Sequence, residues 1–304
     1  MEKEYALSWK RWKEAFILLR IPFSIYLMPI FWFSLSESHP FHVREVIWIF
    51  IIIHIFLYPA SNGYNSWFDR DEESIGGLSK PPEVSPNLFS LVVLWDILTL
   101  AFSLTVSSYF FLMMLTYKLI SKAYSYTPIR LKKYPLLSTL SVTLFQGAFT
   151  YLMVQVGLGR SWSLIWQPVN LQFALISTLF LLGSYPLTQV YQHKEDAERG
   201  DKTISLSLGV RGTFIFSGIS LTASTIYMLS LFALEANYWK IIAFLLLSAP
   251  ISFFFLSWTR KVWKDSSLAD HEHAMRMNQI SSLCFSSIFI LIILIEWQST
   301  TSWW

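Results

Sequence analysis

The 304-residue chain has little charge and almost no cysteine. Only 14% of its residues are Asp, Glu, Lys or Arg, roughly half the share of an ordinary soluble protein. The net charge is +3, so the sequence excludes a nucleic-acid binder built on a basic surface, and its low charge also excludes a disordered chain. The single cysteine, Cys284, cannot form an intrachain disulfide, and we interpret it as a small buried apolar residue.

Apolar side chains are abundant instead, at 54% of the chain, and aromatic side chains make up 17%. Nine apolar runs are long enough, with their flanking residues, to cross a bilayer core about 30 Å thick as helices. No small-residue cleavage site follows the first run, so we expect it to be retained as a membrane span. The sequence predicts a single all-α domain over residues 1–304, a multi-pass bundle of nine transmembrane helices. The runs are 15–35, 46–60, 88–106, 109–120, 136–158, 171–189, 213–234, 241–258 and 280–297.

Basic residues are distributed unequally between the two sides of this bundle. Of the 23 Lys and Arg residues, 19 fall on the side of the N-terminus. Because loops rich in Lys and Arg face the cytoplasm, we expect a cytoplasmic N-terminus and an outer C-terminal tail that ends in Trp303 and Trp304. In a bacterium the membrane would be the inner one. The opposite side has three basic residues, Arg44, Arg160 and Lys240.

Acidic residues gather in two of the loops on the N-terminal side, 61–87 and 190–211. In the first loop, Asn65, Asp69 and Glu73 are four residues apart, which would place them on one face of a helix. Oxygen ligands of this kind favour a hard cation such as Mg²⁺, which often binds substrate phosphates as well. The alternative is a solvated loop whose acids balance Arg70 and Lys80, and this motif alone does not decide between the two.

The second loop carries Glu195 and Asp196 and follows its apolar span as the first loop does. Acidic segments at corresponding positions suggest two pseudo-repeated halves with a site between them. Two such loops could hold a pair of Mg²⁺ ions across one diphosphate and make it a better leaving group.

Three sequence motifs in this order resemble those of the UbiA superfamily of intramembrane prenyltransferases. Asn65, Asp69 and Glu73 match the pattern N-x-x-x-D-x-x-x-D, with Glu in the third place. Residues 196–209 match D-x-x-x-G-x-x-T-x-x-x-x-x-G, and residues 124–132 match Tyr-Ser-x-x-Pro-x-Arg-Leu-Lys.

Two positions depart from the family's pattern. Gln192 stands where the family often has Asp, so either Glu195 supplies the missing carboxylate or the second metal is held more weakly. Lys80-Pro81 replaces an Arg-Pro pair, which keeps the charge but loses the bidentate fork of Arg.

The resemblance implies a cavity that is central, open sideways to lipid and capped on the cytoplasmic side. It also implies Mg²⁺-dependent transfer of a prenyl group from an isoprenoid diphosphate to an apolar or aromatic acceptor, with acceptor identity and prenyl length left open. The implied roles are metal binding by Asn65, Asp69, Glu73, Gln192, Glu195 and Asp196, diphosphate binding by Arg20, Lys80, Arg130 and Lys132, and catalysis by Asp69, Lys80, Tyr124 and Asp196.

Three alternative functions stay open at this point. One is a UbiA-type terpene cyclase, in which no acceptor binds. Another is a non-catalytic relative, suggested by Gln192 and Glu73. The third is a lipid or metabolite transporter, since repeated halves and intramembrane charges occur there too, although transport does not require two acidic loops at the membrane surface.

Four polar residues within or beside the spans have two interpretations each. Arg20 is functional by default inside a span, or it snorkels to the nearby surface. Asp96 is either a base for the acceptor or, as we favour, a hydrogen-bonded acid. Tyr124 lies near the reacting centre or anchors the chain at the interface. Gln146 in the fifth span could touch an acceptor, although no spacing argument selects it.

Overall fold

A computed structural model describes residues 2–301, and the expected outer residues Trp303 and Trp304 lie outside this range. Within it the chain is helical, and its only strand-like pairing is an isolated bridge between Ile75 and Leu78. The α-helices are α1 (Glu2–Leu18), α2 (Met28–Ser36), α3 (Val43–Ile51), α4 (Tyr58–Asp69), α5 (Pro86–Leu104), α6 (Ser108–Ser125), α7 (Pro135–Leu144), α8 (Thr150–Gly157), α9 (Trp162–Ile165), α10 (Pro168–Ser184), α11 (His193–Arg199), α12 (Ile204–Leu234), α13 (Tyr238–Lys264) and α14 (His271–Thr301).

Short 3₁₀ and π segments join or interrupt these helices. The 3₁₀ segments are η1 (Ile21–Leu27), η3 (Leu131–Lys133), η5 (Tyr185–Thr188) and η6 (Ser266–Leu268). The π-helical segments are η2 (Ile52–Leu57) and η4 (Phe145–Phe149).

Eight helical segments of the described chain are long and apolar enough to cross a membrane, which confirms an all-α, multi-pass membrane fold. The remaining expected span, 109–120, which is the fourth in chain order, lies in α6, and α6 packs against α4, α5 and α8. Because α6 carries Lys118 and Lys122 as well as several hydroxyl side chains, it is less apolar than the others. The predicted count of nine is therefore not confirmed. The eight segments are Trp9–Ser36, Val43–Asp69, Pro86–Leu104, Pro135–Gly157, Pro168–Thr188, Ile204–Leu234, Tyr238–Lys264 and His271–Gln298.

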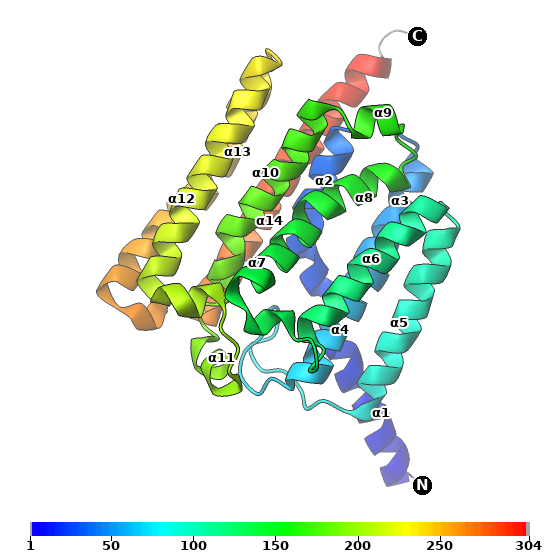
Figure 1. The fold of residues 1–304 in the computed structure, drawn as a ribbon, viewed down its shortest axis with the longest axis vertical. Coiled ribbons are helices and arrows are strands. Elements are labelled where there is room, and N and C mark those ends of the chain that lie inside the picture. Colours follow the sequence, from blue (N-terminus) through cyan, green and yellow to red (C-terminus); the bar gives the residue numbers. More distant parts are fainter. Residues whose placement is uncertain (1, 302–304) are drawn as a thin grey trace.

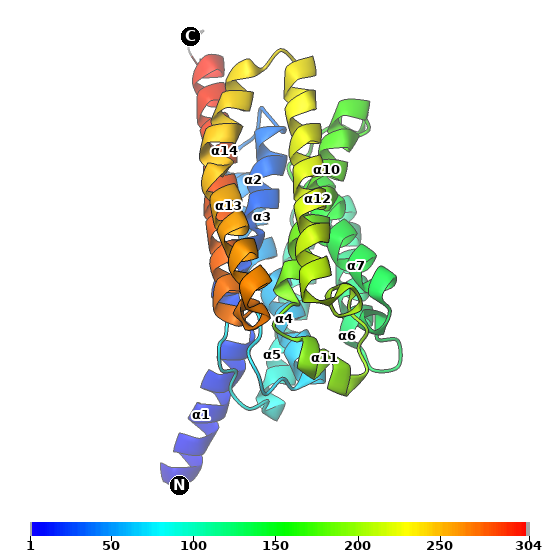
Figure 2. The same cartoon turned by 90° about the vertical axis from the view of Figure 1, so that its left-hand side faces the viewer.

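The long helices run side by side, and the short elements lie at the two ends of the bundle (Figure 1). One end, which we call the α11 end, holds α11 together with the loop that follows α4, and α1 projects beyond it (Figures 1 and 2). The opposite end holds α9 and the end of α14. Both acidic loops thus come together at the end from which α1 extends.

Aromatic packing holds the helices in place around the interior. Phe33 of α2 stacks on Phe289 of α14 with ring centroids 4.5 Å apart, and it also packs edge-on against Phe173 of α10. In a membrane an apolar helix surface is shielded from water whether it faces lipid or another helix, so close packing rather than burial from water stabilises helix association.

A break in the fifth predicted span shapes the interior of the bundle. Gly147 in η4 lies so close to α10 that an added Cβ would sit 2.7 Å from the backbone of Thr178. The Ala148 N–H donates a hydrogen bond of 3.0 Å to the Thr178 hydroxyl of α10. This close approach accounts for the π-helical turn, a feature frequent at functional sites.

Candidate functional site

A cavity of about 300 Å³ lies inside the bundle and reaches the α11 end, between α4, α6, α7, α10 and α11. Its charged lining residues come from both acidic loops and from the segments next to them. The central position of the cavity agrees with the prediction, while its lateral opening to lipid stays a prediction.

Asn65 and Asp69 lie on the last turn and a half of α4 and line the cavity. The Asn65 amide donates to an Asp69 carboxylate oxygen at 2.5 Å and to the Ser125 hydroxyl at 2.9 Å. The helix ends here because Arg70 adopts a left-handed conformation, with φ of 50°. Glu73 therefore lies beyond the helix, and the prediction that it shares a helix face with Asn65 and Asp69 is wrong.

Glu73 and Lys80 are both exposed and do not line the cavity. The Glu73 carboxylate instead pairs with Lys194 at 3.4 Å, on the surface between the two acidic loops. The structure therefore does not bring either residue to the place where the sequence motifs put it.

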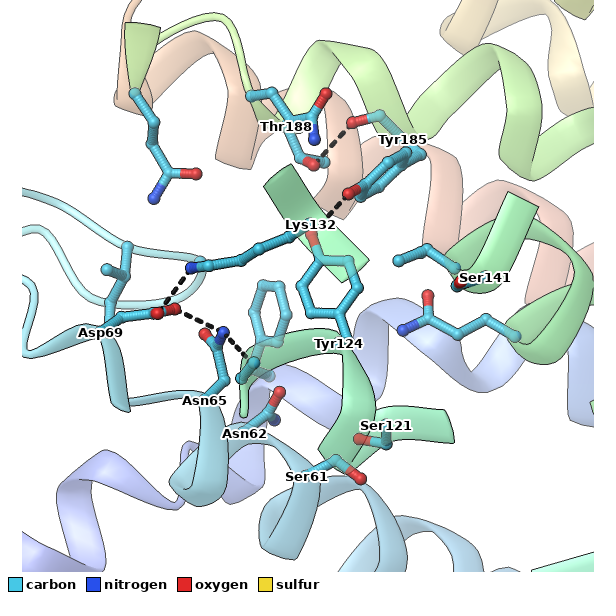
Figure 3. Close-up of a pocket in the computed structure, with 18 of the residues that line it drawn as sticks. Ser61, Asn62, Asn65, Asp69, Ser121, Tyr124, Lys132, Ser141, Tyr185 and Thr188 are labelled. Atoms are coloured by element: carbon cyan, nitrogen blue, oxygen red, sulfur yellow. Dashed lines mark hydrogen bonds and ion pairs between the residues drawn. The ribbon is translucent and has the colours of Figure 1, made fainter. Parts of the chain in front are cut away.

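Two basic residues in the segment after α6, Arg130 and Lys132, lie close to Asp69. The Lys132 ammonium lies 2.5 Å from an Asp69 oxygen and lines the cavity (Figure 3). Arg130 does not line the cavity, and its guanidinium donates two hydrogen bonds, of 2.8 and 2.7 Å, to the buried Asp201. Arg130 itself is 3.4 Å from Asp69. The pair with Asp201 thus fixes the turn that presents Lys132.

Asp196 brings the second acidic loop to the cavity wall. It is buried, and the Thr203 hydroxyl donates to it at 3.3 Å. Burial raises the pKa of the Asp196 carboxyl to about 7, and nearby Lys132 opposes this shift. No ion pair is formed by Asp196 within the described part of the chain, so its carboxylate is the least compensated acid of the cavity.

Gln192 also lines the cavity, whereas Glu195 does not. Glu195 is held by Arg199 one helical turn away and accepts a hydrogen bond of 3.3 Å from the Glu72 N–H. Burial, followed by the nearby carboxylate of Asp71, raises the pKa of Glu195. The structure thus places Glu195 outside the lining of the cavity, and metal binding by its carboxylate stays a prediction.

Asp71 and Arg199 are cavity residues that the sequence motifs missed. Their side chains pair at 2.5 Å across the two acidic loops. A signal existed, since opposite charges occur in two loops expected on the same side of the membrane. The four-residue spacing that starts at Asn65 does not select Asp71, because that spacing holds only if α4 continues past Asp69.

Arg20 lines the cavity from the break between α1 and η1, where its φ of 51° ends α1. Its guanidinium donates to the carbonyl oxygens of Asn62 at 3.1 Å and Gly76 at 3.2 Å. Arg20 is buried and points to the cavity rather than snorkelling away. Four polar atoms of lining residues are buried without a hydrogen-bond partner among the described residues, namely Arg20 Nε, Asn62 Nδ2, Asp69 Oδ1 and Gln189 Oε1. Of these, Asp69 Oδ1 has ion pairs with Lys132 and Arg130. Such atoms indicate a site made for a polar ligand.

Tyr124 also lines the cavity, and its hydroxyl lies 2.7 Å from that of Tyr185, which is 3.1 Å from the Ser138 hydroxyl. It is therefore part of the interior and not an interface anchor. Asp96 lies outside the cavity, where it forms ion pairs with Lys118 and Lys122. These contacts support its interpretation as a paired acid rather than a base for an acceptor.

The residues present fit a Mg²⁺ ion that is held jointly with a substrate. Asp69, Asp71 and Asp196 face the cavity together with the amides of Asn65 and Gln192. Yet no three His, Cys, Asp or Glu residues among those described are grouped closely enough to hold a metal by themselves. Mg²⁺ commonly takes only one or two carboxylates and completes its shell with water and phosphate oxygens.

The chain's sequence matches the model of the UbiA prenyltransferase family over residues 26–280. The chain belongs to this family. No curated protein sequence matches it significantly. The resemblance of its motifs to the UbiA superfamily is thereby confirmed.

Solved structures of UbiA homologues share the fold of this family member. An apo homologue from Aeropyrum pernix K1 has a TM-score of 0.65 and 17% identity, and the match covers 91% of this chain and 98% of that one. A homologue from Archaeoglobus fulgidus bound to DMAPP and Mg²⁺ has a TM-score of 0.63 and 17% identity, covering 93% and 99%. A digeranylgeranylglyceryl phosphate synthase has a TM-score of 0.57 and 17% identity, covering 92% and 99%.

Proposed function

We propose that this UbiA family member is a Mg²⁺-dependent intramembrane prenyltransferase. It would transfer a prenyl group from an isoprenoid diphosphate to a lipophilic or aromatic acceptor and release diphosphate. The observation that carries the proposal is that three separate segments, α4, η3 and α11, bring Asp69, Lys132, Asp196 and Arg199 to the lining of one cavity within the membrane bundle. The binding of DMAPP and Mg²⁺ by a structural relative supports it.

The cavity residues divide the work on the diphosphate between metal and cation binding. Asp69, Asp71 and Asp196 would hold Mg²⁺, which when bound neutralises the charge that develops on the leaving diphosphate. Lys132 and Arg199 donate to the remaining phosphate oxygens once the substrate competes for their present carboxylate partners. The Lys ammonium, which acts as a point charge, and the Arg guanidinium, which donates two parallel hydrogen bonds, are the usual protein donors to phosphate.

Bond breaking and bond making then balance without a further reactant. The bond between C1 of the prenyl group and the diphosphate oxygen breaks, and its electron pair leaves with the diphosphate. C1 bonds to the nucleophilic atom of the acceptor, which loses a proton to diphosphate or water. The face of the Tyr124 ring is able to stabilise the allylic cation character of C1 as a cation–π partner.

The distribution of basic residues indicates which side of the membrane the site faces. We propose that the α11 end faces the cytoplasm, because most Lys and Arg residues lie on the side of the N-terminus. The diphosphate would then enter from the cytoplasm, and each of two pseudo-repeated halves of one domain would supply one acidic loop.

Asp196→Asn tests the function. Purified protein is incubated with labelled geranyl diphosphate, Mg²⁺ and a membrane lipid extract as the source of acceptor. We expect Asp196→Asn to abolish Mg²⁺-dependent product formation, while the exposed control Asp265→Asn retains it. Transfer that survives in Asp196→Asn, or that proceeds equally in EDTA, would contradict the proposal.

A further inference from the structure

The cavity has a second part, farther into the bundle than the acids and bases, which we call the deep wall. It comprises Ser61, Tyr117, Ser121, Ser141 and Gln146. Ser61 precedes Asp69 by two turns of α4, and Tyr117 precedes Ser125 by two turns of α6, so both lie about 12 Å deeper at 1.5 Å per residue. Tyr124 stands between Asp69 on one side and Ser141 on the other (Figure 3).

Gln146 is the most polar group of the deep wall, and the backbone is built to present it. It belongs to the π-helical turn that the contact of Gly147 with Thr178 imposes. Its side chain lines the same part of the cavity as the Tyr117 side chain. An amide offers two N–H donors and two lone pairs, so a single tyrosine hydroxyl could use only a small part of the hydrogen-bonding capacity of Gln146. The rest is available to a ligand in the cavity. An amide inside a span costs free energy unless it finds partners.

The deep wall is polar but uncharged. Every charged residue among the described cavity-lining residues belongs to the segments at the α11 end, and these are Arg20, Asp69, Asp71, Lys132, Asp196 and Arg199. A carboxylate bound against Gln146 would thus be desolvated without a cation, which is costly. A pure hydrocarbon would leave the amide unpaired, which is also costly. A neutral molecule that carries a hydroxyl or carbonyl oxygen avoids both penalties.

We propose that Gln146, together with Tyr117 and Ser121, is the binding site for the acceptor, and that the acceptor bears an uncharged hydroxyl or carbonyl group at this position. The inference rests on the proposed function and names the class of its second substrate. Gln146 binds and orients the acceptor and exchanges no proton. With the diphosphate at the α11 end, this placement leaves the prenyl C1 near Tyr124, between the diphosphate group and the acceptor.

Binding of two matched probes tests the proposal. Methylhydroquinone is neutral, and 2,5-dihydroxybenzoate has the same ring hydroxyls with a carboxylate in place of the methyl group. Their affinities are measured for the full chain in detergent, saturated with Mg²⁺ and geranyl thiodiphosphate, whose own affinity is measured first. We expect the neutral probe to bind at least about tenfold more tightly than the carboxylate, since the latter meets an uncompensated desolvation cost.

Three variants locate the binding. Gln146→Leu is expected to weaken methylhydroquinone about tenfold, and Ser121→Ala, which changes packing least, about threefold. The exposed control Gln167→Leu should change neither affinity, and all three should bind geranyl thiodiphosphate as the unmodified chain does. A carboxylate that binds equally well, no measurable binding of the neutral probe, or unchanged binding in both Gln146→Leu and Ser121→Ala overturns the inference. Failure of the unmodified chain to bind geranyl thiodiphosphate with Mg²⁺ would instead overturn the proposed function.

Discussion

Removing Arg130 tests whether its pair with Asp201 is the support that positions Lys132. The Asp201 side chain has no exposed surface and accepts two hydrogen bonds from Arg130, while Lys132 lies 3.5 Å away. Arg130→Met leaves the Asp201 carboxylate buried with this single, longer contact. Breaking one partner of a buried pair typically costs about 3–5 kcal/mol, and because Lys132 remains we expect about 3 kcal/mol here.

The double variant Arg130→Met with Asp201→Leu separates the pair from other effects of each substitution. It removes both charges and fills their space with apolar atoms, so it should be more stable than Arg130→Met alone. We expect a coupling free energy of about 2 kcal/mol, within the range usual for residues in one ion-pair network.

Unfolding by SDS titration in mixed micelles measures these free energies, and Glu83→Leu serves as an exposed control. If the two single substitutions added to the double within about 0.5 kcal/mol, the pair would not be coupled and the argument that it supports Lys132 would be refuted.

Three further outcomes follow from the site and its packing. Asp69→Asn should lower Mg²⁺-dependent transfer by at least about 100-fold, whereas Glu73→Gln, at an exposed position, should leave it within about twofold, as measured by initial rates. Without Mg²⁺ the folded chain holds the Asp196 proton more tightly than the unfolded chain does, because burial raises the pKa of the Asp196 carboxyl to about 7. The stability of the metal-free protein should therefore fall as pH rises from about 4 to about 7. Mg²⁺ should stabilise the protein more at pH 8 than at pH 6, as measured by thermal unfolding. Gly147→Ala should destabilise the fold by about 1–3 kcal/mol in SDS titration, since the added methyl meets the Thr178 backbone.

Much of the fold was predictable because the length and apolar character of a span depend on many residues. Apolar runs located all eight helical segments that are long and apolar enough to cross a membrane. The remaining predicted span, in α6, is not among these eight because its two lysines and its hydroxyl side chains lower its hydropathy. The motif spacing also placed Asn65 and Asp69 correctly, because they share one α-helix.

The rest of the site depends on backbone breaks that pattern and spacing do not reveal. The helix ends at Arg70 in a left-handed conformation that residues other than glycine adopt rarely, so Glu73 leaves the face and Asp71 enters the cavity. Gln146 is brought to the cavity by a π-turn that depends on contact between Gly147 and a distant helix. Both are tertiary effects.

The central claim is that this chain cleaves an isoprenoid diphosphate with Mg²⁺ and transfers the prenyl group within the membrane. The most direct test reconstitutes the protein in vesicles of a membrane lipid extract and follows labelled geranyl diphosphate. The account predicts equal amounts of released diphosphate and prenylated lipid-soluble product with Mg²⁺, and neither with EDTA. Passage of intact geranyl diphosphate across the vesicle membrane without cleavage would contradict it.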